Sequence, residues 1–318
     1  MTPKRSEVLP KGPVLLDGGV GTEISRRGYE ERHPSIGPAN ALLTDPTLVQ
    51  SVHEDYLRAG ADIITTSTYS TPRDRLEEVG LTGQVEAINR RAGQLAEQAR
   101  QETGNDALIA GSLPPIRGSY RPDWVGDRDE LEPQYREQAQ LLAPYVDLFL
   151  CETMSRVREA QAALAGAEAT ELPVLVSYTI PDTPAGNAEE PSLRSGEPLS
   201  EAVQALADHR AEGVLLNCSI PERITAAMPF LRDATERPIG GYANAFTGIP
   251  EGWNEKTDAT PDRREDLGPE AYGAHAQEWI ASGAQIVGGC CEVGPAHIAH
   301  LREIIDRAAD ARGAGSEA

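Results

Sequence analysis

Short hydrophobic runs of about five residues recur along almost the whole chain, and each leads through a polar segment into a stretch with helical periodicity. The runs predict eight strands, at residues 14–17, 62–66, 107–111, 147–151, 174–178, 214–217, 239–242 and 285–288. Amphipathic stretches between them predict helices at residues 46–59, 84–102, 133–144, 156–167, 199–209, 269–282 and 295–308. This alternation is typical of a parallel sheet whose strands are connected by helices.

Eight β/α units in 318 residues, without a change in composition that would indicate a linker, favour an α/β fold of the (β/α)8 TIM-barrel type. We expect a single domain over residues 1–318, with its core at about residues 13–307. The alternative is an open doubly wound sheet, which usually has fewer strands and a G-x-G-x-x-G turn after the first. The segment DGGVGT has a different glycine spacing and no following lysine, which disfavours a nucleotide-binding loop.

Three predicted connections are unusually long, and all follow the carboxyl ends of strands, where a barrel carries its active site. They are rich in Pro, Gly, Asp and Arg, and they contain Tyr120, Trp124 and Trp253. We expect them to form lids or substrate walls, with ordinary surface insertions as the alternative. The connections are residues 114–132, 179–198 and 243–267.

The charge balance of 50 acidic against 29 basic residues, a net charge of −21, argues against a nucleic-acid partner. No hydrophobic run approaches the roughly 18 residues of a membrane span, and the first 13 residues lack the apolar centre of a secretory signal. We therefore expect a cytoplasmic protein without a membrane partner. The sequence leaves the oligomeric state open, and a homo-oligomer is one of the alternatives.

Four cysteines are too few and too widely spaced for a disulfide framework, which favours reduced thiols with a chemical role.

Polar residues at the carboxyl ends of the predicted strands would meet at one end of a barrel. Three of them are cysteines, and three thiolates there would suit a soft metal such as zinc, with the fourth position left for a reactant. A tight turn with two small buried residues, or a disulfide between adjacent Cys290 and Cys291, are the alternatives. Cys151 is instead expected to pack inside the protein. The residues expected at this end are Asp17, Thr66, Ser67, Thr68, Tyr69, Glu152, Asn217, Cys218, Asn244, Cys290 and Cys291.

Four segments resemble the homocysteine S-methyltransferase family, which includes betaine–homocysteine methyltransferase and the homocysteine-binding module of cobalamin-dependent methionine synthase. They are LLDGGVGTEISRRG at 15–28, GADIITTSTY at 60–69, LLNCS at 215–219 and GGCCEVGPAHI at 288–298. The resemblance extends over about residues 13–307. It implies a Zn2+-dependent (β/α)8 methyltransferase with Cys218, Cys290 and Cys291 as metal ligands, which activate the substrate thiol as a thiolate.

Carried over to this sequence, the resemblance implies that Asp17 and Glu152 face the amino group of homocysteine. Aspartate capping of a turn and glutamate capping of a helix are the respective alternatives. Backbone amides around Gly18 and Gly19 would receive the substrate carboxylate. The resemblance also implies a pocket shaped by Thr66, Ser67, Thr68, Tyr69, Asn217 and Asn244.

The sequence departs from the family pattern where the second substrate would approach. Ser67 stands where the family usually has Asn, Glu292 and Val293 replace a frequent Arg-Thr, and Ala243 stands where Pro is common. These differences leave the identity of the donor open.

We expect transfer of a methyl group from a small onium donor to homocysteine, forming methionine. S-methylmethionine or S-adenosylmethionine is favoured, with betaine or dimethylsulfoniopropionate as the alternative. The chain ends near the eighth β/α unit, which leaves no length for folate or cobalamin modules. A zinc hydrolase with Glu152 as general base, or a zinc-containing binding module, would be the competing classes.

Overall fold

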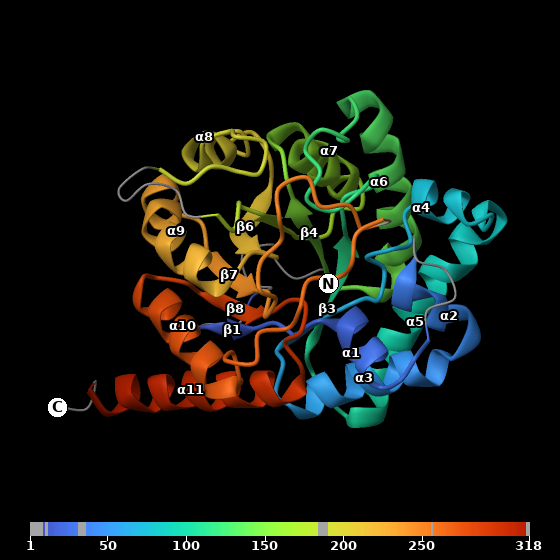
Figure 1. The fold of residues 1–318 in the computed structure, drawn as a ribbon. Coiled ribbons are helices and arrows are strands. Elements are labelled where there is room, and N and C mark those ends of the chain that lie inside the picture. The colour runs from blue at the N-terminus through green and yellow to red at the C-terminus, as the bar shows by residue number, and fades with distance from the viewer. Residues whose placement is uncertain (1–8, 10–11, 31–35, 184–189, 256, 316–318) are drawn as a thin grey trace.

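The eight hydrophobic runs form eight parallel strands of one sheet, with the order β1-β8-β7-β6-β5-β4-β3-β2. The structure is a computed structural model that describes residues 9, 12–30, 36–183, 190–255 and 257–315, with side chains up to residue 308. A parallel bridge between Leu16 and Ile63 joins the first strand to the second, so the sheet closes on itself. The strands surround the centre and the helices lie outside them (Figure 1), which confirms the predicted (β/α)8 barrel.

The strands lie close to the predicted positions, with two differences that affect the site. The fourth strand continues to Met154, so Glu152 lies within a strand and not after it. The first strand is only two residues long by its ladder hydrogen bonds. The strands are β1 (Val14–Leu15), β2 (Ile63–Thr65), β3 (Leu108–Leu113), β4 (Leu148–Met154), β5 (Val174–Tyr178), β6 (Ala211–Asn217), β7 (Ile239–Ala243) and β8 (Ile286–Gly289).

All seven predicted helices are present, although α6 begins five residues earlier than predicted and contains Pro133. A proline removes only one backbone donor, and buried Leu131 and Tyr135 on either side of it anchor the helix. The helices are α1 (Val20–Arg26), α2 (Ala41–Thr44), α3 (Pro46–Arg58), α4 (Arg73–Glu78), α5 (Val85–Thr103), α6 (Arg128–Leu142), α7 (Val157–Glu168), α8 (Leu199–Gln204), α9 (Pro221–Ala234), α10 (Pro269–Ala281) and α11 (Pro295–Gly315), with short 3-10 turns at η2 (Gly37–Asn40), η3 (Thr82–Gln84) and η4 (Ala143–Tyr145).

Helix α9 was not predicted, although it supplies the return from β6 to β7. It begins at Pro221, where a proline is well tolerated, and it buries Ile224, Met228 and Leu231 at helical spacing. The sequence pattern does not predict this helix because Pro229 lies inside it, and a proline in the interior normally disfavours a helix.

Alternate strand residues divide the hydrophobic core into two layers, as the two-residue period of a strand requires. The inner layer fills the barrel with residues such as Leu16, Leu150 and Leu215. The outer layer lies between strands and helices and includes Cys151, which is fully buried and unbonded. The prediction that Cys151 is a packing thiol is confirmed. Among the described residues, no helix is both long and apolar enough to cross a membrane.

The long connections lie at the carboxyl end of the barrel, where they contact one another. The ring of Tyr120, from the connection after β3, packs edge-on against Trp253, from the connection after β7, with centroids 5.7 Å apart. The guanidinium of Arg194, after β5, lies 4.7 Å from the centroid of Tyr120. Part of the connection after β5, residues 184–189, lies outside the described residues. These contacts make the connections a shared wall around the barrel mouth.

Candidate metal and substrate site

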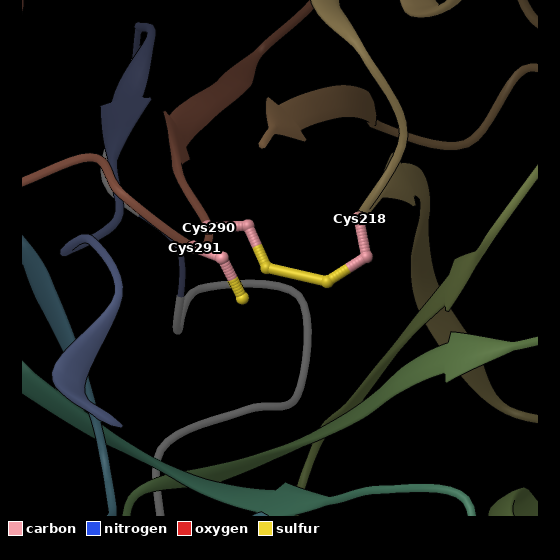
Figure 2. Close-up of side chains that lie close together, drawn as sticks. All are labelled: Cys218, Cys290 and Cys291. Atoms are coloured by element: carbon pink, nitrogen blue, oxygen red, sulfur yellow. A yellow bond between two sulfur atoms is a disulfide. The ribbon is translucent and has the colours of Figure 1, made fainter. Parts of the chain in front are cut away.

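Three cysteines from two strand ends converge at the barrel mouth. Cys218 follows β6, and Cys290 and Cys291 follow β8. Their three sulfur atoms lie within 4.8 Å of one another, and Figure 2 shows the side chains pointing into one space. Cys218 and Cys290 are joined as a disulfide with a Cα–Cα distance of 5.9 Å, while Cys291 is free. The alternative of a disulfide between the adjacent cysteines 290 and 291 is therefore wrong.

The three cysteines are suitable ligands for a tetrahedral zinc ion once the disulfide between Cys218 and Cys290 is reduced. Zinc holds thiolate sulfur at about 2.3 Å, which places two tetrahedral ligands roughly 3.8 Å apart. Cys218, Cys290 and Cys291 are the residues that would hold the metal, and as reduced thiolates they would leave one position open for a ligand. The disulfide is the oxidised state of two of the same thiols.

The glycines near the cysteines are explained by close packing between the turns that follow β1 and β8. A Cβ atom on Gly19 would lie 2.7 Å from the carbonyl oxygen of Cys290 and 3.1 Å from the Cα of Cys291. A Cβ on Gly288 would lie 2.6 Å from the Cβ of Leu16. Glycine is needed here because larger residues would push the cysteine turn away from the first strand.

The expectation that the Gly19 amide receives a substrate carboxylate is wrong. The Gly19 N–H donates to the carbonyl oxygen of Val293 at 3.0 Å, so it already has a partner. Gly18 and Gly19 still line the cavity, where their backbone forms part of the wall.

Several residues at the barrel mouth have a left-handed backbone conformation, which is strained for any residue other than glycine. Cys218 has a φ of 48°, Thr153 62°, Tyr120 63° and Glu292 64°. Among the described residues only one further non-glycine residue, Glu171, has a positive φ. Backbone strain of this kind is commonly concentrated at functional sites, because the surrounding structure must hold it in place.

A cavity of about 400 Å3 opens beside the cysteines. Its lining includes four carboxylates, those of Asp17, Glu152, Glu255 and Glu292, and no Arg, Lys or His among the described residues. Glu255 and Glu292 form ion pairs with Arg75 and Arg26, whereas Asp17 and Glu152 have no basic partner among the described residues. A cationic ligand would therefore meet two carboxylates that no protein cation compensates. The residues predicted for the site that do line it are Asp17, Gly18, Gly19, Thr66, Ser67, Tyr69, Glu152, Cys218, Cys290 and Cys291.

Asp17 is fixed by hydrogen bonds from the neighbouring strand and does not cap its own turn. Its Oδ2 accepts the Thr65 N–H at 2.7 Å, and the Thr65 hydroxyl donates to both carboxylate oxygens at 3.1 Å. Burial raises the pKa of Asp17 well above its usual value, the hydrogen bonds from Thr65 lower it, and the nearby charge of Glu152 raises it. No basic side chain among the described residues forms an ion pair with Asp17.

Glu152 is held by two side chains that also line the cavity. The Ser112 hydroxyl donates to Oε1, and the Tyr242 hydroxyl lies 3.4 Å from Oε2 as a donor. Burial raises the pKa of Glu152 to about 7, against the opposing effect of these hydrogen bonds. The helix-capping alternative for Glu152 is wrong, because the residue lies in β4 and bonds to β3 and β7.

Two predicted pocket residues lie behind the wall and not on it. The Asn217 oxygen accepts the Thr153 N–H at 2.9 Å and the Ser177 hydroxyl at 2.7 Å, and its amide donates to the Thr153 hydroxyl. The Thr68 hydroxyl donates to the Ser112 carbonyl oxygen at 2.8 Å. Their polar atoms bond within the protein and neither residue lines the cavity, so they could shape the pocket only by fixing the strand ends that line it.

Asn244 lies at the carboxyl end of β7 and is fully buried, but it does not line the cavity. Its backbone N–H donates to the Ser219 carbonyl oxygen at 3.0 Å. Burial raises the pKa of Tyr120 well above its usual value, and a hydrogen bond with the Asn244 side chain lowers it.

The aromatic residues of the long connections divide into two groups. Tyr120, Phe246 and Trp253 line the cavity and pack with Ile249 beside the cysteines. Trp124 does not line it; its ring lies under the Arg121 guanidinium at 3.9 Å, on an outer surface depression. Trp124 is therefore not part of the substrate wall that its connection was expected to form.

Ser112, Tyr242, Phe246 and Glu255 line the cavity but were not singled out from the sequence. Ser112 and Tyr242 could have been suspected, because each lies one residue before the end of its strand, on the inward-facing side. Nothing in the local sequence marks Glu255, which reaches the cavity only through the course of the connection after β7.

Comparison with known proteins places this site in one family. The family model for homocysteine S-methyltransferase matches residues 14–305. Homocysteine S-methyltransferase 4 of Zea mays is 29% identical over 93% of this chain and 90% of its own length. Selenocysteine methyltransferase of Astragalus bisulcatus is 29% identical over 92% of each.

Solved structures of the homocysteine methyltransferase MmuM from Escherichia coli share the fold. The metallated form is 28% identical with a TM-score of 0.77, over 92% of this chain and 96% of that one. The oxidized form is 27% identical with a TM-score of 0.78, over 94% and 98%. The E. coli protein therefore has both a metal-bound and an oxidized state.

Replacing Gly19 by Ala should weaken metal binding by the three thiols. Gly19 has a φ of −72°, which alanine adopts freely, so the effect would come from contacts of the new Cβ with the cysteine turn and with the Thr22 hydroxyl oxygen, which would lie 2.5 Å away. Residues that support metal ligands typically contribute about 10- to 100-fold in affinity. Titration of the reduced protein with cobalt(II), followed by its thiolate absorption, should show a loss of this size.

Gly21→Ala is the matched control, because its Cβ would make only an ordinary 3.5 Å contact with Pro38. This variant should bind cobalt like the unchanged protein. Equal affinity of Gly19→Ala and the unchanged protein would show that the turn does not depend on this contact.

Proposed function

The chain belongs to the homocysteine S-methyltransferase family, and we propose that it methylates homocysteine with zinc held by Cys218, Cys290 and Cys291 and a small onium compound as methyl donor. Family membership makes it a methyltransferase that converts homocysteine to methionine. The observation that carries the proposal is a cavity that joins three converging thiols to four carboxylates and has no basic side chain among its described lining residues. We further propose that it acts in the cytoplasm, where such thiols are kept reduced.

The three cysteines provide a suitable place to activate a thiol. A free thiol has a pKa of about 8.5 and is mostly protonated at neutral pH, whereas the thiolate is the nucleophile. Zinc, when bound, would supply the positive charge that keeps the acceptor sulfur deprotonated. Three thiolate ligands keep that sulfur more electron-rich than neutral histidine ligands would. The metallated form of the E. coli relative supports a metal at this site.

Asp17 and Glu152 are the proposed partners of the homocysteine ammonium. Both carboxylates are buried in the cavity wall, and burial raises the pKa of each. A bound ammonium would favour their charged forms, because an opposite charge at short range offsets the loss of hydration. The hydrogen bonds from Thr65, Ser112 and Tyr242 would then fix where that ammonium lies.

The net charge of the cavity supports a cationic donor. S-methylmethionine and S-adenosylmethionine carry a net charge of +1 at neutral pH, whereas betaine and dimethylsulfoniopropionate carry none. Glu292, at a position where the family frequently has Arg, adds a carboxylate to the lining. The aromatic side chains of Tyr120, Phe246 and Trp253 lie beside the cysteines, and ring faces attract onium groups by about 0.5–2 kcal/mol.

The reaction is an in-line displacement. A lone pair of the homocysteine thiolate forms the new S–CH3 bond as the C–S+ bond of the donor breaks, and its electron pair stays on the departing sulfur. The thiol proton is lost to solvent before this step. With S-methylmethionine as donor, both products are methionine.

Neither competing class gains support from the structure. A hydrolase would need Glu152 as a general base beside a metal-bound water, and neither the matching family nor the reported relatives are hydrolases. A purely structural metal would need a fourth protein ligand, and within the described residues the cluster comprises the three cysteines alone.

The zinc ligands can be tested by metal analysis of the reduced protein, which should contain about one zinc per chain. Cys290→Ser should lose most of the metal and the activity, because two thiolates hold zinc more weakly than three. Cys151→Ala is the control and should keep both, since Cys151 lies in the outer core layer. Full zinc in Cys290→Ser, or zinc loss in Cys151→Ala, would refute the assignment.

Asp17→Asn and Glu152→Gln should impair the use of homocysteine more than zinc binding. Each removes one charge-assisted contact with the ammonium, at a cost of about 1.5–3 kcal/mol in kcat/KM. The comparison substrate is 4-mercaptobutanoate, a thiol without the amino group. Equal losses with both thiols would mean that the carboxylates do not bind the amine.

The donor is identified by methionine formation from homocysteine with parallel methyl sources. S-methylmethionine and S-adenosylmethionine should be used best, followed by betaine and dimethylsulfoniopropionate, because the cavity favours net positive charge. Methyltetrahydrofolate and methylcobalamin should be inactive. Turnover with either of these two and with none of the onium compounds would overturn the donor assignment.

A further inference from the structure

Glu255 brings a carboxylate to the cavity from a different part of the molecule than Asp17 and Glu152. Asp17 follows β1 and Glu152 lies in β4, so both belong to the strand ends that form the floor of the cavity. Glu255 belongs to the connection between β7 and α10, which forms part of the wall. The cavity therefore has acidic groups in its wall as well as in its floor.

A buried arginine holds Glu255 in place. Nη1 of Arg75, in α4, lies 2.8 Å from Oε1 of Glu255, and the two side chains are 4% and 18% exposed. Nη2 of Arg75 donates to the Pro115 carbonyl oxygen at 3.1 Å and reaches the Ser119 hydroxyl at 3.5 Å. Because these contacts hold the Arg75 guanidinium in place, the Glu255 carboxylate is held in place too. Moving the carboxylate away would leave the buried charge of Arg75 unpaired.

The ion pair uses only one oxygen of the Glu255 carboxylate. No hydrogen bond or ion pair among the described residues involves its Oε2, although the residue lines the cavity. A carboxylate held by one oxygen and open at the other is arranged to accept a hydrogen bond from a cationic ligand.

The neighbourhood of Glu255 suits the far end of an amino-acid sulfonium. Trp253, two residues earlier, belongs to the aromatic group beside the cysteines, where the reacting methyl group would lie. Tyr69, Ser70 and Ser119 line the same cavity, and the Tyr69 and Ser119 hydroxyls lie 2.9 Å apart, so one of these two donates to the other. The remaining hydroxyl and that of Ser70 can donate to a carboxylate. Together with Glu255 they form a place for both charges of an α-amino acid, although the lining has no basic side chain among the described residues.

We propose that Glu255 binds the α-ammonium of the methyl donor and thereby selects amino-acid sulfonium donors, with Arg75 as its positioning residue. This inference rests on the proposed onium-dependent methyl transfer. It adds a reason for donor choice beyond net charge: betaine and dimethylsulfoniopropionate have an onium group and a carboxylate, but no ammonium for Glu255 to bind.

The test is the steady-state kinetics of Glu255→Gln with S-methylmethionine and with dimethylsulfoniopropionate. The substitution keeps the size of the side chain and removes its charge. The KM for S-methylmethionine should rise about 10- to 100-fold, with kcat, zinc content and the KM for homocysteine within about twofold of the unchanged enzyme. The KM or inhibition constant of dimethylsulfoniopropionate should stay the same.

Glu251→Gln is the matched control, because Glu251 is an exposed residue of the same connection that does not line the cavity. It should leave every constant unchanged. The inference is overturned if Glu255→Gln leaves the KM for S-methylmethionine unaltered, or weakens both sulfonium compounds equally, as a role confined to holding the connection would. If the unchanged enzyme uses no onium donor, the proposed function itself has failed, and the two failures are thus distinguishable.

Discussion

The site depends on a steric constraint, the contact between the turn after the first strand and the turn after the last. Gly19 and Gly288 allow the two backbones to approach, and larger side chains would separate them. This contact fixes the backbone of Cys290 and Cys291 against Asp17, the first polar residue of the barrel mouth. Because β1 is also paired with β8, the closure of the barrel and the position of the Cys290 and Cys291 sulfur atoms have the same structural cause.

A second constraint is electrostatic and acts against the stability of the fold. Asp17 and Glu152 are buried without a basic partner among the described residues, and burial of such groups costs free energy. Their hydrogen bonds to Thr65, Ser112 and Tyr242 reduce this cost, although burial still raises the pKa of both carboxyl groups. The protein thus keeps carboxylates available at the cavity, which an ordinary core would pair or exclude.

The sequence was sufficient to predict the barrel and the convergence of the three thiols, because the strands of a parallel barrel all bring their carboxyl ends to the same end of the barrel. It was insufficient where tertiary contacts decide a role. Asn217 and Thr68 have the residue types of a pocket, yet their polar atoms bond to neighbouring strands. Glu255 reaches the cavity because a long connection crosses the barrel mouth and is held there by Arg75. No local pattern encodes such a crossing.

The acidic lining also bears on how the reaction ends. In the proposed transfer from S-methylmethionine, the donor enters with a net charge of +1 and both products leave with none, because the sulfonium and the thiolate neutralise each other. A cavity with four carboxylates and no basic side chain among its described lining residues attracts the first species more than the second. Turnover therefore weakens the attraction that brought the donor in. The same carboxylates that favour binding of the donor limit inhibition by the methionine it produces.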